Sequence, residues 1–342
     1  MKKYVLPTML FATCYLVSCK KEDPASLVNA TEATTTNAGT TAHRSSPSPS
    51  SVSLGNLPDY LMVFTNGSSD ANWQGATKGF CGNMFVNGNV AHERTSGNVP
   101  FGGVLSTSKD QLAAWQGIID DNVSQSSVST SQGSKMAELT QDLTLAMTQI
   151  NGLTVSAGYS NVSASSLNGL NTMNGIGETI VINITSGMSV NSQINITGDA
   201  NDTYILRWDS DANPANGYQG KAKFQSGGAI VPHGDLIATN FINVAGDIGS
   251  SGGGSNPAYP YPQGPRYNNG TGALVNGGAN FNGGGFFTGY WLTTGDPNTG
   301  NTSSLSNAIF VGGWFTTSTS ISMTSGTSGV HVNKPQSLPE YN

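Results

Sequence analysis

Short runs of alternating hydrophobic and polar residues dominate the chain after residue 153. Residues 178–185 place Ile180, Ile182 and Ile184 at every second position, and residues 192–197 repeat this alternation. A period of two puts alternate residues on the same side of a β-strand. Similar runs follow at residues 204–208, 228–231, 235–237, 241–244, 308–312 and 320–323. Gly, Asn, Ser and Thr separate the runs, so the sequence predicts many short strands.

Two earlier segments have the period of an amphipathic helix. The apolar stripe of residues 136–150 consists of Met136, Leu139, Leu143, Met147 and Ile150. The dipeptide Asn151-Gly152 then marks a helix end. Residues 109–121 repeat the helical spacing with Leu112, Trp115 and Ile119, after a capping box of Ser108 and Gln111. We expect both segments to be helices that pack an apolar face on the β-structure.

Strands of four to six residues with polar turns favour a β-solenoid, in which each coil contributes small hydrophobic residues to the interior. A β-sandwich would also explain the alternation, but sandwich strands are usually spaced more evenly. We therefore predict a mainly β fold, a β-solenoid with one or two α-helices packed alongside.

Composition and charge narrow the possible functions. The 342 residues include 44 Gly and only 34 charged side chains, which excludes long charged helices and coiled coils. The net charge of -6 provides no basic surface for phosphates, so nucleic acid is not an expected partner.

The first residues have the pattern of a secretion signal. Lys2 and Lys3 precede a mostly apolar run over residues 4–17, which is too short to span a bilayer. The run ends in Leu-Val-Ser-Cys, which resembles a bacterial lipobox with Cys19 as the lipidated residue. We predict a lipoprotein signal peptide at residues 1–18 and a membrane anchor of acyl chains, such as palmitate, on Cys19.

The rest of the chain divides by composition. Residues 19–53 contain the lipidated Cys and a disordered Ser/Thr/Pro-rich tether. Residues 54–333 form the predicted solenoid domain, and residues 334–342 form a tail. Charged residues 20–23 resemble the export tag of Bacteroidota surface lipoproteins, which implies an outer-membrane protein facing the cell exterior.

Cysteine usage allows no disulfide within the mature chain. Cys14 leaves with the signal peptide and Cys19 is acylated, so Cys81 alone keeps a thiol. Cys81 fits a small buried hydrophobic residue better than a nucleophile.

Several stretches are similar to the choice-of-anchor A domain family. They are residues 54–87 (LGNLPDYLMVF onward), 159–185 (YSNVSASSLNGL onward), the strand ILRW at 205–208, and 228–243 (GGAIVPHGDLIA onward). The resemblance implies a right-handed β-solenoid (β-helix) with a helix packed along it, as in ice-binding-like proteins. It also implies a surface protein, and some members are labelled collagen-binding. The chain departs from this family in its N-terminal anchor and in an insertion at residues 249–289.

The insertion is rich in Gly and aromatic residues. Its candidate binding residues are Tyr259, Tyr261, Arg266, Tyr267, Phe286, Phe287, Tyr290 and Trp291, the last two lying just beyond or at its end. Aromatic side chains on a long loop often form contact surfaces for proteins or glycans. The alternative is that these rings cap the open end of the solenoid against solvent.

Catalysis and metal binding have little support in the sequence. The four His residues lie far apart, and the only acidic cluster contains Asp199, Asp202, Asp209 and Asp211. Asp209, Asp211 and Asn213 have the spacing that begins a calcium loop, but Pro214 replaces the required Gly, so a polar Asx turn is the alternative. His233 is expected in a surface turn. We predict no cofactor and no enzymatic activity.

Three functions remain open at this point. The first is a lipid-anchored surface adhesin that binds an extracellular matrix protein or a glycan through the insertion. The second is ice binding, which needs a flat face with Thr or Ala recurring from coil to coil; residues 316–324 offer a local Thr/Ser patch. The third, a polysaccharide-active enzyme, would depend on Asp209 and Asp211.

Overall fold

A computed structural model of the chain describes fifteen stretches of the sequence. They are residues 52–66, 70–73, 79–87, 89–92, 101–102, 104–108, 128–208, 220–251, 267–268, 274–275, 285–294, 302–306, 308–318, 320–324 and 328–330. Nearly all strands in these stretches pair in parallel. No helix of the described stretches is long and apolar enough to cross a membrane.

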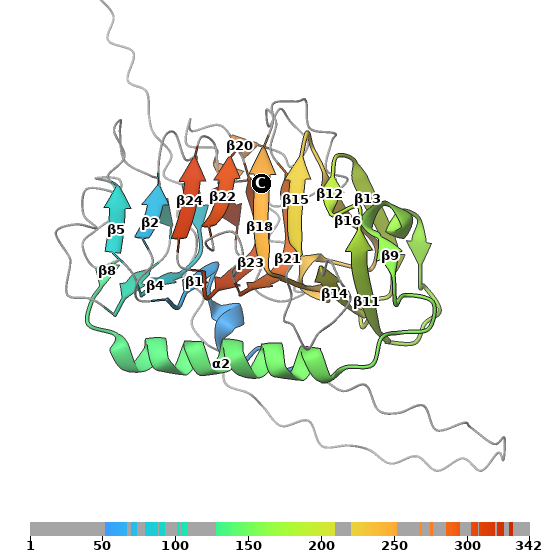
Figure 1. Ribbon diagram of the computed structural model, residues 1–342, viewed down its shortest axis with the longest axis horizontal. Helices are drawn as coiled ribbons and strands as arrows, with labels where there is room; N and C mark the ends of the chain where they lie inside the picture. Colours follow the sequence, from blue (N-terminus) through green and yellow to red (C-terminus); the bar gives the residue numbers. More distant parts are fainter. Residues whose placement is uncertain are drawn as a thin grey trace, which may run out of the picture.

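The strands wind into a rod with three long faces (Figure 1). The first face contains, in spatial order, β8 (Val128–Ser129), β7 (Leu105–Thr107), β4 (Met84–Val86), β1 (Met62–Phe64), β23 (Ile309–Thr316), β21 (Phe286–Thr293), β17 (Phe241–Ala245), β14 (Thr203–Trp208), β11 (Thr179–Ser186) and β9 (Val162–Ser163). The second face contains β10 (Leu170–Asn171), β13 (Gln193–Gly198), β16 (Ala229–Gly234), the first halves of β21 and β23, β25 (Ser328–Val330), β3 (Gly79–Cys81) and β6 (Phe101–Gly102). The third face contains β12 (Ser189–Val190), β15 (Lys221–Gln225), β18 (Asp247–Ser251), β22 (Thr302–Ser306), β24 (Ser320–Thr324), β2 (Asp70–Trp73) and β5 (Asn89–His92).

The chain visits the faces in a fixed sequence. Strands β11, β12 and β13 lie on the first, third and second face, and β14, β15 and β16 repeat this order. Outside this pattern lie the antiparallel pair β19 (Tyr267–Asn268) and β20 (Leu274–Val275), the helix α2 (Gly133–Gly152) and the 3-10 turns η1 (Leu57–Asp59), η3 (Ala164–Leu167) and η5 (Ala238–Asn240). This arrangement is a β-solenoid, as predicted, and the parallel pairing excludes an antiparallel sandwich.

The order of coils along the rod differs from their order in the chain. Strand β1 lies between β4 and β23, so the beginning and the end of the fold meet in the middle of the first face. The same junction joins β2 to β24 and β3 to β25. From the junction the chain coils outward to β8, follows α2 along the rod, and coils back from β9 (Figure 1).

The interior of the rod is an apolar cluster rich in aromatic rings. Phe287 stacks on Phe310 with ring centroids 4.9 Å apart, and Phe310 stacks on Trp314 at 5.6 Å. Three fully buried Trp residues each have a partner for the indole N–H: Trp208 donates to Asn243 Oδ1, Trp291 to the Thr288 carbonyl, and Trp314 to Thr293 Oγ1. The interior therefore contains large side chains without leaving their polar atoms unpaired.

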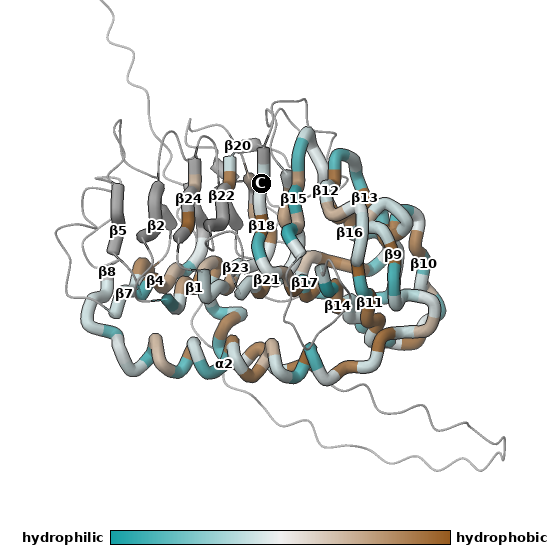
Figure 2. Tube along the Cα trace, viewed as in Figure 1, coloured by the Kyte–Doolittle hydropathy of each residue, from teal (hydrophilic) through white to brown (hydrophobic). Residues whose placement is uncertain are grey.

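Helix α2 covers the outer side of the first face. Its buried residues Met136, Leu139, Leu143, Ala146 and Ile150 form a second apolar cluster with outward-facing strand residues. The strand contributions are Val63, Phe85, Val181, Ile205, Ile242, Val244, Tyr290, Leu292 and Phe315. Hydrophobic positions recur along α2 and along the neighbouring strands of the first face (Figure 2), and the buried ones pack together. The helix thus packs on strands from both sides of the junction and holds the two halves together.

Residues 53–56, which we call the strap, are hydrogen-bonded to this helix. The Ser53 N–H donates to Gln149 Oε1 at 2.8 Å, and the Asn56 N–H donates to Asp142 Oδ2 at 2.8 Å. Gly55 has a φ of +56°, and a Cβ at this position would lie 2.2 Å from Asp142 Cγ. The close approach of strap and helix therefore requires glycine.

A buried guanidinium group lies at the C-terminal end of α2. Arg207, in β14, is 2% exposed and donates from Nη2 to the Leu153 carbonyl at 2.6 Å. Leu153 is the residue that ends α2, so the guanidinium lies at the negative end of the helix dipole.

Most of the predicted elements that fall on described residues are present. The helix predicted over residues 136–150 is α2, and seven of the eight predicted strand runs are strands. The exception is residues 235–237, where the strand prediction is wrong: Gly234 has a φ of +69° and ends β16, and the chain turns into η5. The helix predicted over residues 109–121 lies outside the described residues.

The helix-covered cluster can be tested with two leucines two residues apart. Leu143 is 1% exposed and Leu145 is 48% exposed. We expect Leu143→Ala to lower the free energy of unfolding by about 2–5 kcal/mol, because it leaves a cavity under the helix. Leu145→Ala is the matched control and should change it by less than about 0.5 kcal/mol. Denaturant unfolding measures both, and equal effects would contradict the packing described.

A buried tyrosine under the helix predicts a loss of stability at high pH. Burial, with a contribution from Asp59, raises the pKa of Tyr290 to about 12. An unfolded Tyr loses its proton near pH 10, so between about pH 10 and 12 the unfolded state binds fewer protons than the folded state. We expect the Tm to fall across this window, and to fall less steeply in Tyr290→Phe. Identical slopes for both proteins would contradict this expectation.

Candidate functional site

The third face carries the most regular polar pattern of the described surface strands. Strands β22 and β24 pair in parallel over five consecutive residue pairs without a bulge. Leu305, Ile321 and Met323 on these strands are fully buried in the interior cluster. The alternate positions of the two strands therefore belong to the outer side of the sheet.

Every alternate position of these two strands is Ser or Thr. The register pairs Thr302 with Ser320, Ser304 with Ser322, and Ser306 with Thr324. We call these six residues the hydroxyl ladder. The register arranges these positions in three cross-strand rows, and Ser and Thr are both uncharged residue types that carry a hydroxyl group.

The rows continue differently on the neighbouring strands. On β2, Asp70 pairs with Ser320 and Asn72 pairs with Ser322. On the other side, Gly249 of β18 pairs with Ser304. The pure Ser/Thr pattern is thus two strands wide, and the sheet does not show Thr rows on three or more successive coils.

One hydrogen-bonded link fixes the edge of the ladder against β18. Ser250 Oγ donates to the Ser306 carbonyl at 2.8 Å, and the Ser306 N–H donates to Ser250 Oγ at 2.8 Å. Ser250 is 6% exposed, so this pair of bonds is shielded from water. The backbone of Ser306 is therefore held at a defined position.

On this side of the ladder, the charged residues of the third face lie on β18 and β15. Lys221 forms a 2.7 Å ion pair with the carboxylate of Asp247, which is fully buried. Lys223, two residues further along β15, pairs with Gly249. The third face is thus uncharged at β22 and β24 and cationic at β15.

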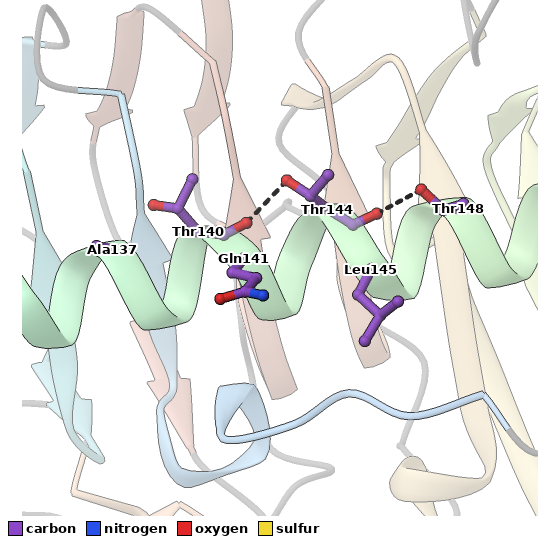
Figure 3. A pocket seen from close by; sticks show the side chains of 6 residues that line it. All are labelled: Ala137, Thr140, Gln141, Thr144, Leu145 and Thr148. Carbon is purple, nitrogen blue, oxygen red and sulfur yellow. Dashed lines mark hydrogen bonds between the residues drawn. The ribbon is translucent and has the colours of Figure 1, made fainter.

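A shallow, open depression lies on the solvent side of α2 (Figure 3). It is lined by Ala137, Thr140, Gln141, Thr144, Leu145 and Thr148. The hydroxyls of Thr140, Thr144 and Thr148 each donate to the carbonyl four residues earlier, at 2.8 Å. These donors are already used within the helix, and no titratable group lines the depression, so it offers no chemistry for catalysis.

The acidic residues Asp199 and Asp202 organise the backbone near one end of the rod. Asp202 is fully buried and accepts from Thr172 Oγ1 and from the N–H groups of Glu178 and Asp199. Asp199 Oδ2 accepts from the N–H groups of Asn174 and Gly175. Both carboxylates act as acceptors for turns, a structural role.

Other candidate ligands do not cluster in the described stretches. Within these stretches, no three His, Cys, Asp or Glu side chains are placed to hold a metal ion. His233 lies in β16 rather than in a turn, which corrects the prediction from sequence, and its Nε2 lies 2.8 Å from Asn195 Oδ1.

Four of the predicted binding aromatics are core residues. Phe286, Phe287, Tyr290 and Trp291 lie in β21 and are 3%, 0%, 6% and 0% exposed. Phe287 and Trp291 face the interior, and Tyr290 packs under α2. A binding role for these four at the surface is therefore wrong, because a buried ring cannot contact a partner.

Several other predictions concern residues whose side chains are not described. Tyr267 lies in β19, and nothing further is described for it. The candidates Cys19, Asp209, Asp211, Asn213, Tyr259, Tyr261 and Arg266 lie outside the described residues. Their roles remain predictions.

Comparison with known proteins gives structural neighbours only. No protein-family model matches the chain, and no curated protein matches it. The chain is similar to a crystal structure of an ice-binding protein from an Arctic yeast, with a TM-score of 0.49 and 13% identity over 86% of this chain and 100% of the other. It is also similar to the ice-binding protein 1 domain (DUF3494) of Shewanella frigidimarina, with a TM-score of 0.44 and 11% identity over 82% and 97%. An ice-binding protein from an Antarctic Flavobacteriaceae bacterium has a TM-score of 0.43 and 12% identity over 83% and 49%. The fold assignment of this chain rests on its own strand pairing.

Proposed function

We propose that the protein binds ice through the hydroxyl ladder of the third face, while a lipid on Cys19 anchors it to the outer membrane and displays it outside the cell. The observation that carries this proposal is the unbroken register of β22 and β24, with Ser or Thr at all six alternate positions. In this proposal the protein binds its target without transforming it.

Strand geometry supports an ordered target. Neighbouring strands lie about 4.8 Å apart, and alternate residues of one strand lie about 6.6 Å apart. The backbone register therefore sets the six ladder positions, all Ser or Thr, on a two-dimensional grid. A crystal of water has repeats of comparable size, and each hydroxyl can both donate and accept a hydrogen bond.

The chemistry of the ladder also favours ice over a charged ligand. Ser and Thr are small and uncharged, so the ladder offers no charge to an ionic ligand. The hydrogen bonds of Ser250 to Ser306 fix one edge of the ladder. A rigid array loses little conformational entropy when it binds a rigid surface.

A bulky residue in the middle of the ladder tests the proposal. We expect Ser322→Tyr to lower thermal hysteresis and the fraction of protein taken up by growing ice by about tenfold, the scale of a central contact residue. Tyr is well tolerated in strands, so the Tm should change little.

The matched control is Thr144→Tyr on the exposed side of α2. It adds the same ring far from the third face, and ice uptake should stay at the level of the unmodified protein. Undiminished uptake in Ser322→Tyr, or absent uptake in the unmodified protein, would contradict ice binding.

Adhesion to a matrix protein or a glycan is the alternative function. The eight residues predicted to carry it lie in the insertion or at its end; four of them are buried and three lie outside the described residues. No described feature favours it over ice binding. If the protein from Leu54 onward binds a matrix-protein or glycan array but does not bind ice, this result would favour adhesion.

Anchoring can be tested with two cysteines of the signal region. We expect cells that express the unmodified protein to incorporate labelled palmitate into it and to retain it in the membrane fraction. Cys19→Ala should lose both the label and the membrane retention, because its thiol is the predicted acylation site. Cys14→Ala is the matched control and should keep both. Label on the Cys19→Ala protein would contradict this assignment.

A further inference from the structure

The outward residues of the first face change from apolar to polar where α2 ends. Along one row of the parallel register, Phe315, Leu292 and Val244 belong to the helix-covered apolar cluster. The same row continues with Arg207 on β14 and Asn183 on β11. Both polar residues are buried, since Arg207 is 2% exposed and Asn183 is 7% exposed. A charge and an amide buried in this way need hydrogen-bond partners.

The end of the helix satisfies only part of this need. Arg207 Nη2 donates to the Leu153 carbonyl at 2.6 Å, and the negative end of the helix dipole offsets part of the positive charge. Neither of the two ion pairs among the described residues involves Arg207. The guanidinium is therefore balanced by the helix end and not by a described carboxylate.

Three buried polar atoms remain without a hydrogen-bond partner in the described part of the chain. They are Arg207 Nε, Asn183 Oδ1 and Asn151 Oδ1. Arg207 and Asn183 are neighbours in the register of β11 and β14. Asn151 lies two residues before Leu153, whose carbonyl binds Arg207. All three atoms thus belong to one small region between the end of α2 and two strands of the first face.

We propose that this region binds one internal water molecule, which bridges the C-terminal end of α2 to β11 and β14. The Nε–H group is a donor, and the two amide oxygens are acceptors. A water molecule can accept one hydrogen bond and donate two, so it matches all three atoms. Buried waters typically make about three hydrogen bonds to groups that have no other partner. Neighbouring strands lie about 4.8 Å apart, a separation that one water can span with two hydrogen bonds of about 2.9 Å.

The same chemistry disfavours a bound ion. Two of the three atoms are acceptors and the nearby helix end is negative, so an anion would be repelled from three directions. A metal cation would be repelled by the guanidinium of Arg207. A neutral ligand that both donates and accepts is the chemical class that fits. The water joins the helix end to two successive coils of the rod.

Magnetic resonance tests the water in the unmodified protein. We expect magnetisation transfer from water to the Arg207 Nε–H group, whose resonance is identified by its loss in Arg207→Lys. The indole N–H of Trp208 is the matched control, because it is buried on the same strand and already donates to Asn243 Oδ1. It should receive no such transfer. No transfer to Arg207, or equal transfer to both groups, would overturn the proposal.

A substitution at the neighbouring strand tests the bridge. Asn183→Leu should abolish the transfer to Arg207, because it removes one acceptor and fills the space of the water. Asn201→Leu makes the same change at an exposed position and should keep the transfer. Unchanged transfer in Asn183→Leu would overturn the proposal.

A crystal structure of the unmodified protein distinguishes water from an anion and does not depend on any variant. We expect one water peak within about 3.2 Å of both Arg207 Nε and Asn183 Oδ1. Crystals soaked in bromide should show no anomalous signal at this position. A bromide peak there would identify an anion site. A direct hydrogen bond between Arg207 Nε and Asn183 Oδ1 would show that no bridge is needed. Either result would overturn the proposal.

Discussion

The first face is buried on both of its sides, and this constraint organises the rest of the fold. Its strands present one set of residues to the interior of the rod and the other set to α2. The β1–β23 junction divides the rod into two halves that are far apart in the chain. Phe85 from one half and Val181 from the other belong to the same helix-covered cluster. The helix therefore does more than cover apolar surface. It joins coils that the chain itself leaves unconnected at the β1–β23 junction.

Local patterns in the sequence identified the elements whose signals are local. The helical stripe around Leu143 and the alternation of Ile180, Ile182 and Ile184 depend on neighbours only a few residues away. The junction could not be predicted in this way, because Met62 and Trp314 are 252 positions apart and nothing in either segment encodes the other. The pairing of β22 with β24 was missed for the same reason. Strand β22 itself was not among the predicted runs, because residues 302–306 contain a single hydrophobic residue, Leu305.

The aromatic residues of β21 show a different limit of sequence analysis. Phe286 to Trp291 follow a Gly-rich segment, and that context suggested a binding loop. The structure places Phe287 and Trp291 inside the rod and Tyr290 under α2, because a strand that crosses from the second face to the first is buried on both sides. Such a strand has a continuous hydrophobic run rather than an alternating one. Length and composition alone could not separate this arrangement from an exposed aromatic cluster.

The path of α2 has a consequence for how the rod can change its length. Strands β8 and β9 lie at opposite ends of the first face, and α2 lies within the segment that connects them. Each additional coil would lengthen the rod by about 4.8 Å, whereas a helix gains about 1.5 Å per residue. A duplicated coil would therefore require about three more helical residues to keep the two ends connected. An open solenoid can grow by simple repetition of a coil. Here growth would need two coordinated insertions, one coil in the sheets and one turn in α2. The length of the helix therefore limits the number of coils.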